Sequence, residues 1–134
     1  MKPRAPLQDL LRCRRCGKNI ADRRYPLLID ATNPRCPKCI FKSLASRHLR
    51  KSGSWTALRD LFVRQGFRCA YSGCHLVLGG NATIDHRIPK SKGGKCTIDN
   101  LQWVTGEIND LKGCTNHDDF LRLCKAVSSC SAVQ

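Results

Sequence analysis

Apolar and polar positions in the middle of the chain recur with the spacing of helices. Between residues 40 and 51, apolar side chains return every three or four positions, which predicts a helix with one buried stripe. His48 continues that stripe, so we expect a packed histidine there rather than a metal ligand. A second helix is predicted from Trp55 onward, because Ser54 can cap its start and Gly66 can end it.

Shorter apolar runs predict strands on both sides of these helices. One short strand is expected over residues 25–29. A β-hairpin is expected further on, with residues 76–78 as its first strand, 79–81 as the turn and 82–86 as the returning strand. Residues 87–99, which are polar and contain two adjacent glycines, then predict a long loop.

The last third of the chain predicts two more helices. Thr105 is a good N-cap for a helix that runs to about Lys112, and Gly113 can end that helix. Asn116 can cap a final helix, with an acidic residue three positions later. The buried stripe of the final helix is expected to consist of Phe120, Leu123, Cys124 and Val127.

Two closely spaced pairs of cysteines flank the first predicted strand. Cys13 and Cys16 form one C-x2-C pair, and Cys36 and Cys39 form another after 19 intervening residues. Each pair can aim two thiolates at one ion, and two pairs complete the closed four-cysteine site typical of structural Zn²⁺. The alternative is four unrelated reduced cysteines. Because the surrounding core is small, we expect metal binding to supply much of this region's stability.

The formal net charge of +14 lies almost entirely in the first half of the chain. Residues 1–66 contain 16 Lys and Arg against 4 Asp and Glu, whereas residues 67–134 contain 8 against 6. This distribution favours a polyanion binder, with a merely soluble basic surface as the plainer alternative. No apolar run is long enough to span a bilayer and no export signal begins the chain, so we expect a cytoplasmic protein with reduced cysteines and no membrane association.

The residues that suggest chemistry begin at the end of the strand expected over 82–86. Asp85 and His86 stand side by side there, Asn100 follows after 13 residues, and Asn109 after a further 8. This pattern resembles the HNH nucleases of the ββα-metal (His-Me finger) superfamily. The segments that carry the resemblance are Asp85-His86-Arg87-Ile88-Pro89, Ser91-Lys92-Gly93-Gly94, Asn100-Leu101-Gln102-Trp103 and Ile108-Asn109-Asp110-Leu111-Lys112-Gly113. Without the two asparagines, the Asp-His pair would indicate only a hydrogen-bonded strand end.

The resemblance implies hydrolysis of phosphodiester bonds, which needs an activated water, a cation on the phosphate and help for the leaving oxygen. His86 would be the general base, since a neutral imidazole accepts a proton near pH 7. Asp85 and Asn109 would ligate Mg²⁺ or Mn²⁺ through oxygen, although many relatives carry His at the position of Asn109. Asn100 would hold the loop and orient the base. Lys112 would contact phosphate, unless it is a solvated surface charge.

Together these features predict an α+β protein in three parts. Residues 1–40 are expected to form a four-cysteine zinc-ribbon-like module, 41–66 basic connecting helices, and 67–134 an HNH ββα-metal catalytic domain with a packed C-terminal helix. A second zinc site is disfavoured by irregular spacing; its candidate ligands are Cys69, Cys74, Cys114 and His117.

The expected activity is metal-dependent endonucleolytic hydrolysis of double-stranded DNA. The alternatives are a non-catalytic zinc-ribbon nucleic-acid-binding protein on an HNH-like scaffold and a cysteine-rich structural or redox protein. The basic residues expected to contact DNA phosphates are Arg14, Arg15, Lys18, Arg23, Arg24, Lys38, Lys42, Arg47, Arg50, Lys90, Lys92, Lys95 and Lys112.

Overall fold

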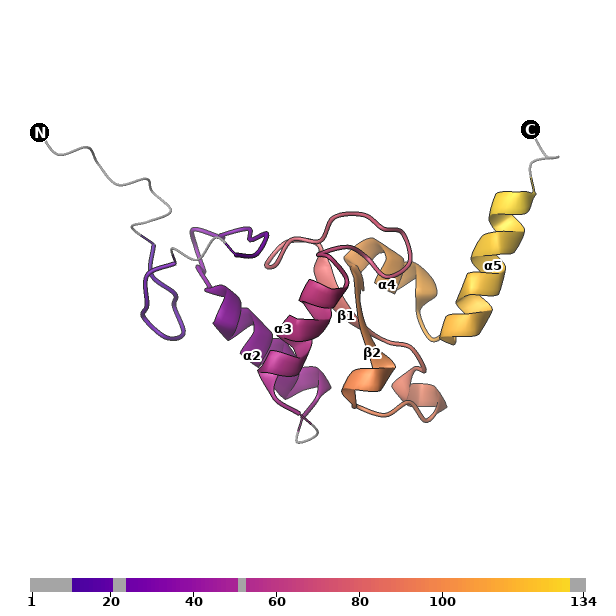
Figure 1. The fold of residues 1–134 in the computed structure, drawn as a ribbon, viewed down its shortest axis with the longest axis horizontal. Coiled ribbons are helices and arrows are strands. Elements are labelled where there is room, and N and C mark those ends of the chain that lie inside the picture. The colour runs from indigo at the N-terminus through magenta and orange to yellow at the C-terminus, as the bar shows by residue number, and fades with distance from the viewer. Residues whose placement is uncertain (1–10, 21–23, 51–52, 131–134) are drawn as a thin grey trace, which may run out of the picture.

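Four α-helices and one two-stranded antiparallel sheet form the regular structure of the computed structural model, which describes residues 11–20, 24–50 and 53–130 (Figure 1). The predicted mixture of helix and strand is therefore confirmed. None of the helices in the described ranges has the length and apolarity needed to cross a membrane.

The two strands come from segments that are far apart in the sequence. Strand β1 (Ala82–His86) pairs with β2 (Leu101–Thr105), with Ile84 opposite Trp103. The predicted hairpin between residues 76–78 and 82–86 is therefore wrong.

A side chain at the turn explains why the predicted hairpin does not form. The Asn81 carboxamide accepts the backbone N–H of Val77 (2.8 Å), so the chain turns without a strand ladder. Leu78 instead forms an isolated parallel bridge with Leu27, and both Leu76 and Leu78 are fully buried. Local alternation predicted the burial of these leucines but not their partner. The strand expected over residues 25–29 is likewise reduced to this single bridge.

The two helices in the middle of the chain lie close to their predicted positions. Helix α2 (Pro37–His48) starts three residues before the predicted 40–51, since proline fits the first helical turn, where its missing N–H is not needed. Helix α3 (Trp55–Arg64) is capped by Ser54, whose hydroxyl accepts the N–H of Thr56 (3.1 Å). The cap of α3 was predicted from local sequence, whereas Cys36 at the start of α2 makes no side-chain capping hydrogen bond and α2 ends at His48, before the predicted residue 51.

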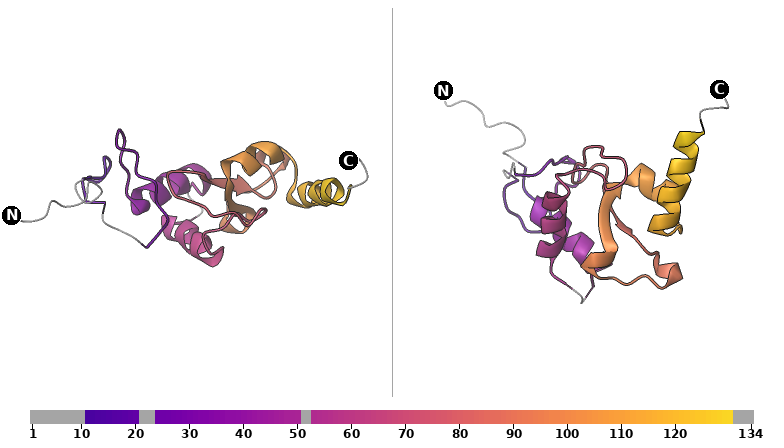
Figure 2. Two further views of the ribbon diagram at one scale, coloured as in Figure 1. Left: turned by 90° about the horizontal axis from the view of Figure 1, so that it is seen from above. Right: turned by 45° about the vertical axis from the view of Figure 1, so that its right-hand side comes forward.

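The two C-terminal helices differ in how they meet the rest of the protein. Helix α4 (Gly106–Lys112) is capped by Thr105 as predicted and packs on the sheet. Helix α5 (His117–Ser129) stands away from the sheet in Figures 1 and 2. Of its predicted stripe only Phe120 is buried, against the ring of Tyr71; the exposed members are Leu123, Cys124 and Val127. The prediction of a buried stripe there is wrong beyond Phe120, because no described element covers it.

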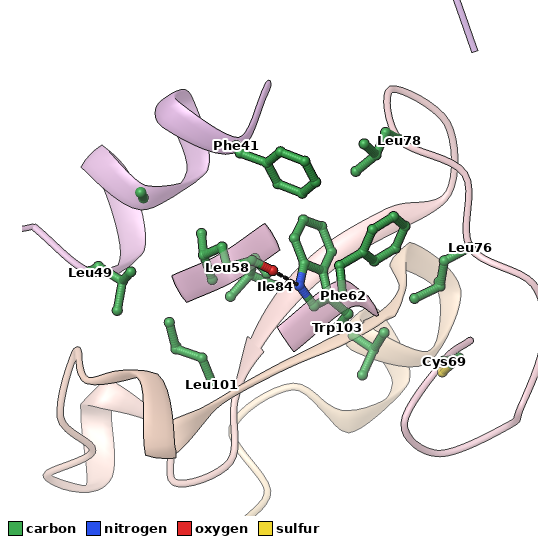
Figure 3. Close-up of a cluster of buried hydrophobic side chains, with 12 residues drawn as sticks. Phe41, Leu49, Leu58, Phe62, Cys69, Leu76, Leu78, Ile84, Leu101 and Trp103 are labelled. Carbon is green, nitrogen blue, oxygen red and sulfur yellow. Dashed lines mark hydrogen bonds between the residues drawn. The ribbon is translucent and has the colours of Figure 1, made fainter. Parts of the chain in front are cut away.

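One hydrophobic core joins α2 and α3 to the sheet (Figure 3). Trp103 is fully buried at its centre, and its ring lies 4.8 Å from Phe62 and 5.9 Å from Phe41, between centroids. The indole N–H donates to the carbonyl of Leu58 (3.0 Å), which satisfies its only polar atom. The helices that the sequence presents as connectors thus pack directly on β2.

Replacing Phe62 with alanine tests this core. The cavity left beside Trp103 should lower the free energy of unfolding by about 3–5 kcal/mol. The neighbouring Val63 is 51% exposed, so Val63→Ala is the matched control and should change stability by no more than about 0.5 kcal/mol. Denaturant unfolding measures both variants. Equal effects from the two would contradict the packing described.

Candidate active site and metal centre

The four cysteines of the two C-x2-C pairs gather at one point. Their sulfur atoms all lie within 4.8 Å of one another, so the cluster could hold a metal ion as predicted. The first pair is shaped by a tight turn in which the N–H of Gly17 donates to the carbonyl of Cys13 (2.8 Å). Gly17 has a φ of +74°, a backbone conformation that favours glycine. In the described ranges no second cluster of this kind occurs, and the alternative set of Cys69, Cys74, Cys114 and His117 does not come together.

The thiols of the cluster are not equivalent. Burial opposes ionisation of Cys13, but backbone N–H groups of Cys36, Cys16 and Arg15 outweigh it and lower the pKa of Cys13 to about 6. Burial raises the pKa of Cys39 to about 12. Zinc binds thiolates, so Cys13 is prepared as a ligand near neutral pH whereas Cys39 must lose its proton as the metal enters.

Asp85 is buried at the end of β1, and each of its carboxylate oxygens accepts one hydrogen bond from a neighbouring side chain. It is 4% exposed, its Oδ2 accepts the amide of Gln102 (2.8 Å), and its Oδ1 accepts the ammonium of Lys112 (3.1 Å). Gln102 lies directly opposite Asp85 in the sheet register, which explains how its side chain reaches the carboxylate. The carboxylate is therefore held in one orientation by β2 and α4.

Lys112 takes a position that neither sequence interpretation predicted. Its side chain is 1% exposed, and its ammonium also donates to the backbone carbonyl of His86 (3.0 Å). The prediction of a solvated charge is wrong, and the ammonium does not face outward as a phosphate contact would. The reason is the buried carboxylate, since an uncompensated charge at Asp85 would be costly.

His86 follows Asp85 and sits among other titratable groups. Its Nε2 lies 3.9 Å from the sulfur of Cys96, and its ring centroid lies 5.6 Å from that of His48. Burial and the positive charges of Lys90 and Lys112 lower the pKa of His86 below its ordinary value. The negative charge of Asp85 opposes this shift but does not cancel it. The imidazole is thus neutral at pH 7 and able to accept a proton.

His48 is a neighbour that sequence patterning placed in the core without linking it to His86. Burial first, and then the charge of His86, lower the pKa of His48 to about 4. Its Nδ1 is buried and has no hydrogen-bond partner in the described part of the chain. The expectation of a packed histidine at this position agrees with these contacts.

The two asparagines occupy different surroundings. The Asn100 amide donates to the carbonyls of Ile88 (3.0 Å) and Lys95 (2.9 Å), while its oxygen accepts the N–H of Ile88 (2.9 Å). Asn100 therefore ties both ends of the loop between the strands. Asn109 lies one turn before Lys112 on α4, and its side chain makes no hydrogen bond within the described residues, so its amide oxygen is available.

A pocket of about 400 Å³ adjoins this site. It lies between the loop and the start of α5, and its lining includes Arg87, Lys95, Asn100 and His117 but neither Asp85 nor His86.

His117 is fixed at this pocket by a partner that the sequence did not suggest. Its Nδ1 lies 2.7 Å from the Tyr71 hydroxyl. Burial raises the pKa of Tyr71 to about 12, so the hydroxyl is protonated, and the tautomer of His117 decides which of the two groups donates. A tyrosine separated from a histidine by 46 positions carries no pairing signal in sequence.

The basic residues predicted to contact DNA are almost all exposed. Arg23 lies outside the described residues, and Lys112 is buried as noted above. The exposed members are Arg14, Arg15, Lys18, Arg24, Lys38, Lys42, Arg47, Arg50, Lys90, Lys92 and Lys95.

Comparison with known families supports the motif reading. Residues 69–104 match the family model described as HNH endonuclease. This segment covers β1, the loop with Asn100 and nearly all of β2, so this part of the chain matches the HNH endonuclease family, as the resemblance predicted. No curated protein and no solved structure matches the chain.

The cysteine cluster generates a prediction about metal content. We expect one Zn²⁺ per chain, and Cys36→Ser should lose it and lower the melting temperature, because three thiolates close the tetrahedral site poorly. Cys74 is exposed and outside the cluster, so Cys74→Ser is the control that keeps the metal. Elemental analysis and thermal melting measure both. Full zinc content in the Cys36 variant would refute the assignment.

The buried ion pair generates a prediction about stability. Lys112→Met leaves the Asp85 carboxylate buried without a counter-charge and should cost about 3–5 kcal/mol. The exposed Lys92 supplies the control, and Lys92→Met should stay within about 0.5 kcal/mol of wild type. The double variant Asp85→Asn, Lys112→Met should recover much of the loss. Denaturant unfolding that shows no difference between the two single variants would rule out a structural ion pair.

Proposed function

We propose that the protein is a metal-dependent HNH endonuclease that hydrolyses phosphodiester bonds of double-stranded DNA. The observation that carries this proposal is the pairing of a buried, oriented carboxylate at Asp85 with a neutral imidazole at His86, on the segment that matches the HNH model. The side chain of Asn109 on helix α4, which packs on the sheet, would supply a second oxygen ligand beside Asp85.

His86 acts as the general base in this proposal. Its lowered pKa keeps the ring neutral, so it can take a proton from the attacking water. Asn100 holds the loop that follows His86 and so limits the positions that the imidazole and Lys90 can take. This role needs no reaction at Asn100 itself.

The oxygen donors fit a hard divalent cation. Asp85 and Asn109 would hold Mg²⁺ or Mn²⁺, which would supply positive charge to the phosphate. Each carboxylate oxygen of Asp85 can accept two hydrogen bonds and accepts one, from Gln102 or from Lys112, so one acceptor position remains on each. The nearby ammonium weakens cation binding by charge repulsion, which favours a weakly held ion.

Substrate binding is assigned to the exposed basic residues on both sides of the catalytic pair. Lys90, Lys92 and Lys95 extend from the loop that Asn100 ties down. The cysteine module and the basic face of α2 add the larger share of positive charge. Lys112 is left out of this set, because its ammonium is engaged with Asp85.

A non-catalytic nucleic-acid-binding protein is the second candidate. The observation that favours it is the Lys112 ammonium, which already neutralises the carboxylate that a cation would need. Such a protein would keep the basic surface and the scaffold but would bind DNA without cutting it.

Incubation of zinc-loaded protein with supercoiled plasmid and Mg²⁺ separates the two candidates. Wild type should nick or linearise the plasmid, and His86→Ala should be slower by about 10²–10⁴-fold, the usual contribution of a general base. His75 is an exposed histidine away from the site, and His75→Ala should cut like wild type. An intact plasmid with bound wild-type protein would favour the second candidate.

A further inference from the structure

Three arginines converge on one hollow of the cysteine module, away from Asp85 and His86. The hollow has a volume of about 370 Å³, and its lining is Arg14, Arg15, Asn33, Arg35 and Ser43. We infer that it is a binding pocket for a phosphate group of the nucleic-acid backbone, with Arg35 as its central residue. That the phosphate belongs to a nucleic-acid backbone rests on the proposed action on DNA. That the pocket suits an anion follows from its arginines alone.

A single hydroxyl holds two of the guanidinium groups together. Ser43 Oγ accepts from Arg15 Nη1 (3.1 Å) and from Arg35 Nη2 (3.0 Å). Two like charges beside one neutral oxygen repel each other, and an anion between them removes that repulsion. Guanidinium groups also offer paired N–H donors that match phosphate oxygens.

No ion pair among the described residues neutralises the charge of these arginines. In the described residues, the ion pairs join Arg59 to Asp60, Lys112 to Asp85 and Arg122 to Asp119, and none includes an arginine of the pocket. The carboxylate of Asp30, which lines a neighbouring hollow together with Asn33 and Arg35, accepts the N–H and hydroxyl of Thr32 and forms no ion pair with these arginines among the described residues. Within the described residues, the three arginines of the pocket therefore have no ion-pair partner.

Arg35 has donor capacity that the protein leaves unused. Its Nε is buried and makes no hydrogen bond within the described part of the chain, while Nη2 reaches the Cys39 carbonyl only at 3.4 Å. The buried Nε is closed to an anion in the hollow, but Nη1 makes no hydrogen bond within the described residues and is the donor of Arg35 that an anion could use. Arg35 is half-buried, so its position is more restricted than that of a surface arginine.

The cysteine pairs build this pocket. Arg15 lies inside the first pair, and Arg35 directly precedes the second. The N–H of Arg14 donates to the carbonyl of Pro34 (2.8 Å), which joins the two turns, and the Arg14 guanidinium donates to the Thr32 carbonyl (2.9 Å). Metal binding by the cysteines would therefore also position the arginines.

The test measures DNA binding without cleavage. Zinc-loaded full-length protein without Mg²⁺ is titrated into a fluorescent 20-base-pair duplex at several salt concentrations, and anisotropy gives Kd. Arg35→Ala should weaken binding by about tenfold and reduce the slope of log K against log salt by about 1, the value of one phosphate contact. Arg35→Lys keeps the charge but loses the paired donors, and should fall between wild type and Arg35→Ala.

The matched control is Arg122→Ala, which removes the same charge from α5, where Asp119 already pairs with it (3.2 Å). It should change Kd by less than about twofold. The zinc content of each variant must equal that of wild type. If Arg35→Ala loses zinc, the Kd of Arg35→Lys is compared with that of Arg122→Lys instead. Equal losses of DNA affinity in the Arg35 and Arg122 variants would overturn the inference that this hollow binds phosphate.

A competition arm separates a backbone phosphate from a free phosphate ion. Inorganic phosphate should displace the duplex only at millimolar concentrations, and to the same extent as sulfate. Displacement by micromolar phosphate but not by sulfate would assign the pocket to a free phosphate ion and overturn the inference. Because no arm uses cleavage, binding that depends on Arg35 without any plasmid cutting would refute the nuclease proposal alone.

Discussion

Asp85 is buried at the end of β1, and its charge is tolerable only because Lys112 of α4 and Gln102 of β2 hold it. A buried carboxylate without a partner would cost several kcal/mol, so this contact joins the helix to both strands. The same contact fixes the direction of Asp85 and brings Asn109, one turn earlier on α4, to the same side of the helix. The geometry proposed for catalysis thus depends on an interaction that is first of all structural.

The rigidity of this site comes from the core behind the sheet. Trp103 lies next to Gln102 on β2, and its ring packs between Phe41 of α2 and Phe62 of α3. Alternation along the strand sends Trp103 to the helices and leaves Gln102 facing Asp85. The helical segment is therefore a support for the site as well as a basic surface, and His48 at the end of α2 reaches the ring of His86.

Positive charge is organised at two separate places. The loop that follows His86 carries three exposed lysines, and the arginines of the cysteine module surround a hollow of their own. Under the proposed function, such a division would let one region hold the substrate while the other acts on it. The cysteine cluster then stabilises the module and sets the spacing of Arg14, Arg15 and Arg35.

The sequence by itself determined the features that depend on local spacing: helices α2, α3 and α4, the caps of α3 and α4, the cysteine pairs, and the Asp85-His86 motif at a strand end. Only the tertiary structure decided the partner of β1, the burial of Lys112, the exposure of the α5 stripe and the sharing of Ser43 by two arginines. Helix periodicity and capping act within a few residues and are therefore visible in the chain. Strand partners and buried counter-charges are chosen by packing between distant segments, where the free energy of the whole core, and not the local pattern, selects the contact.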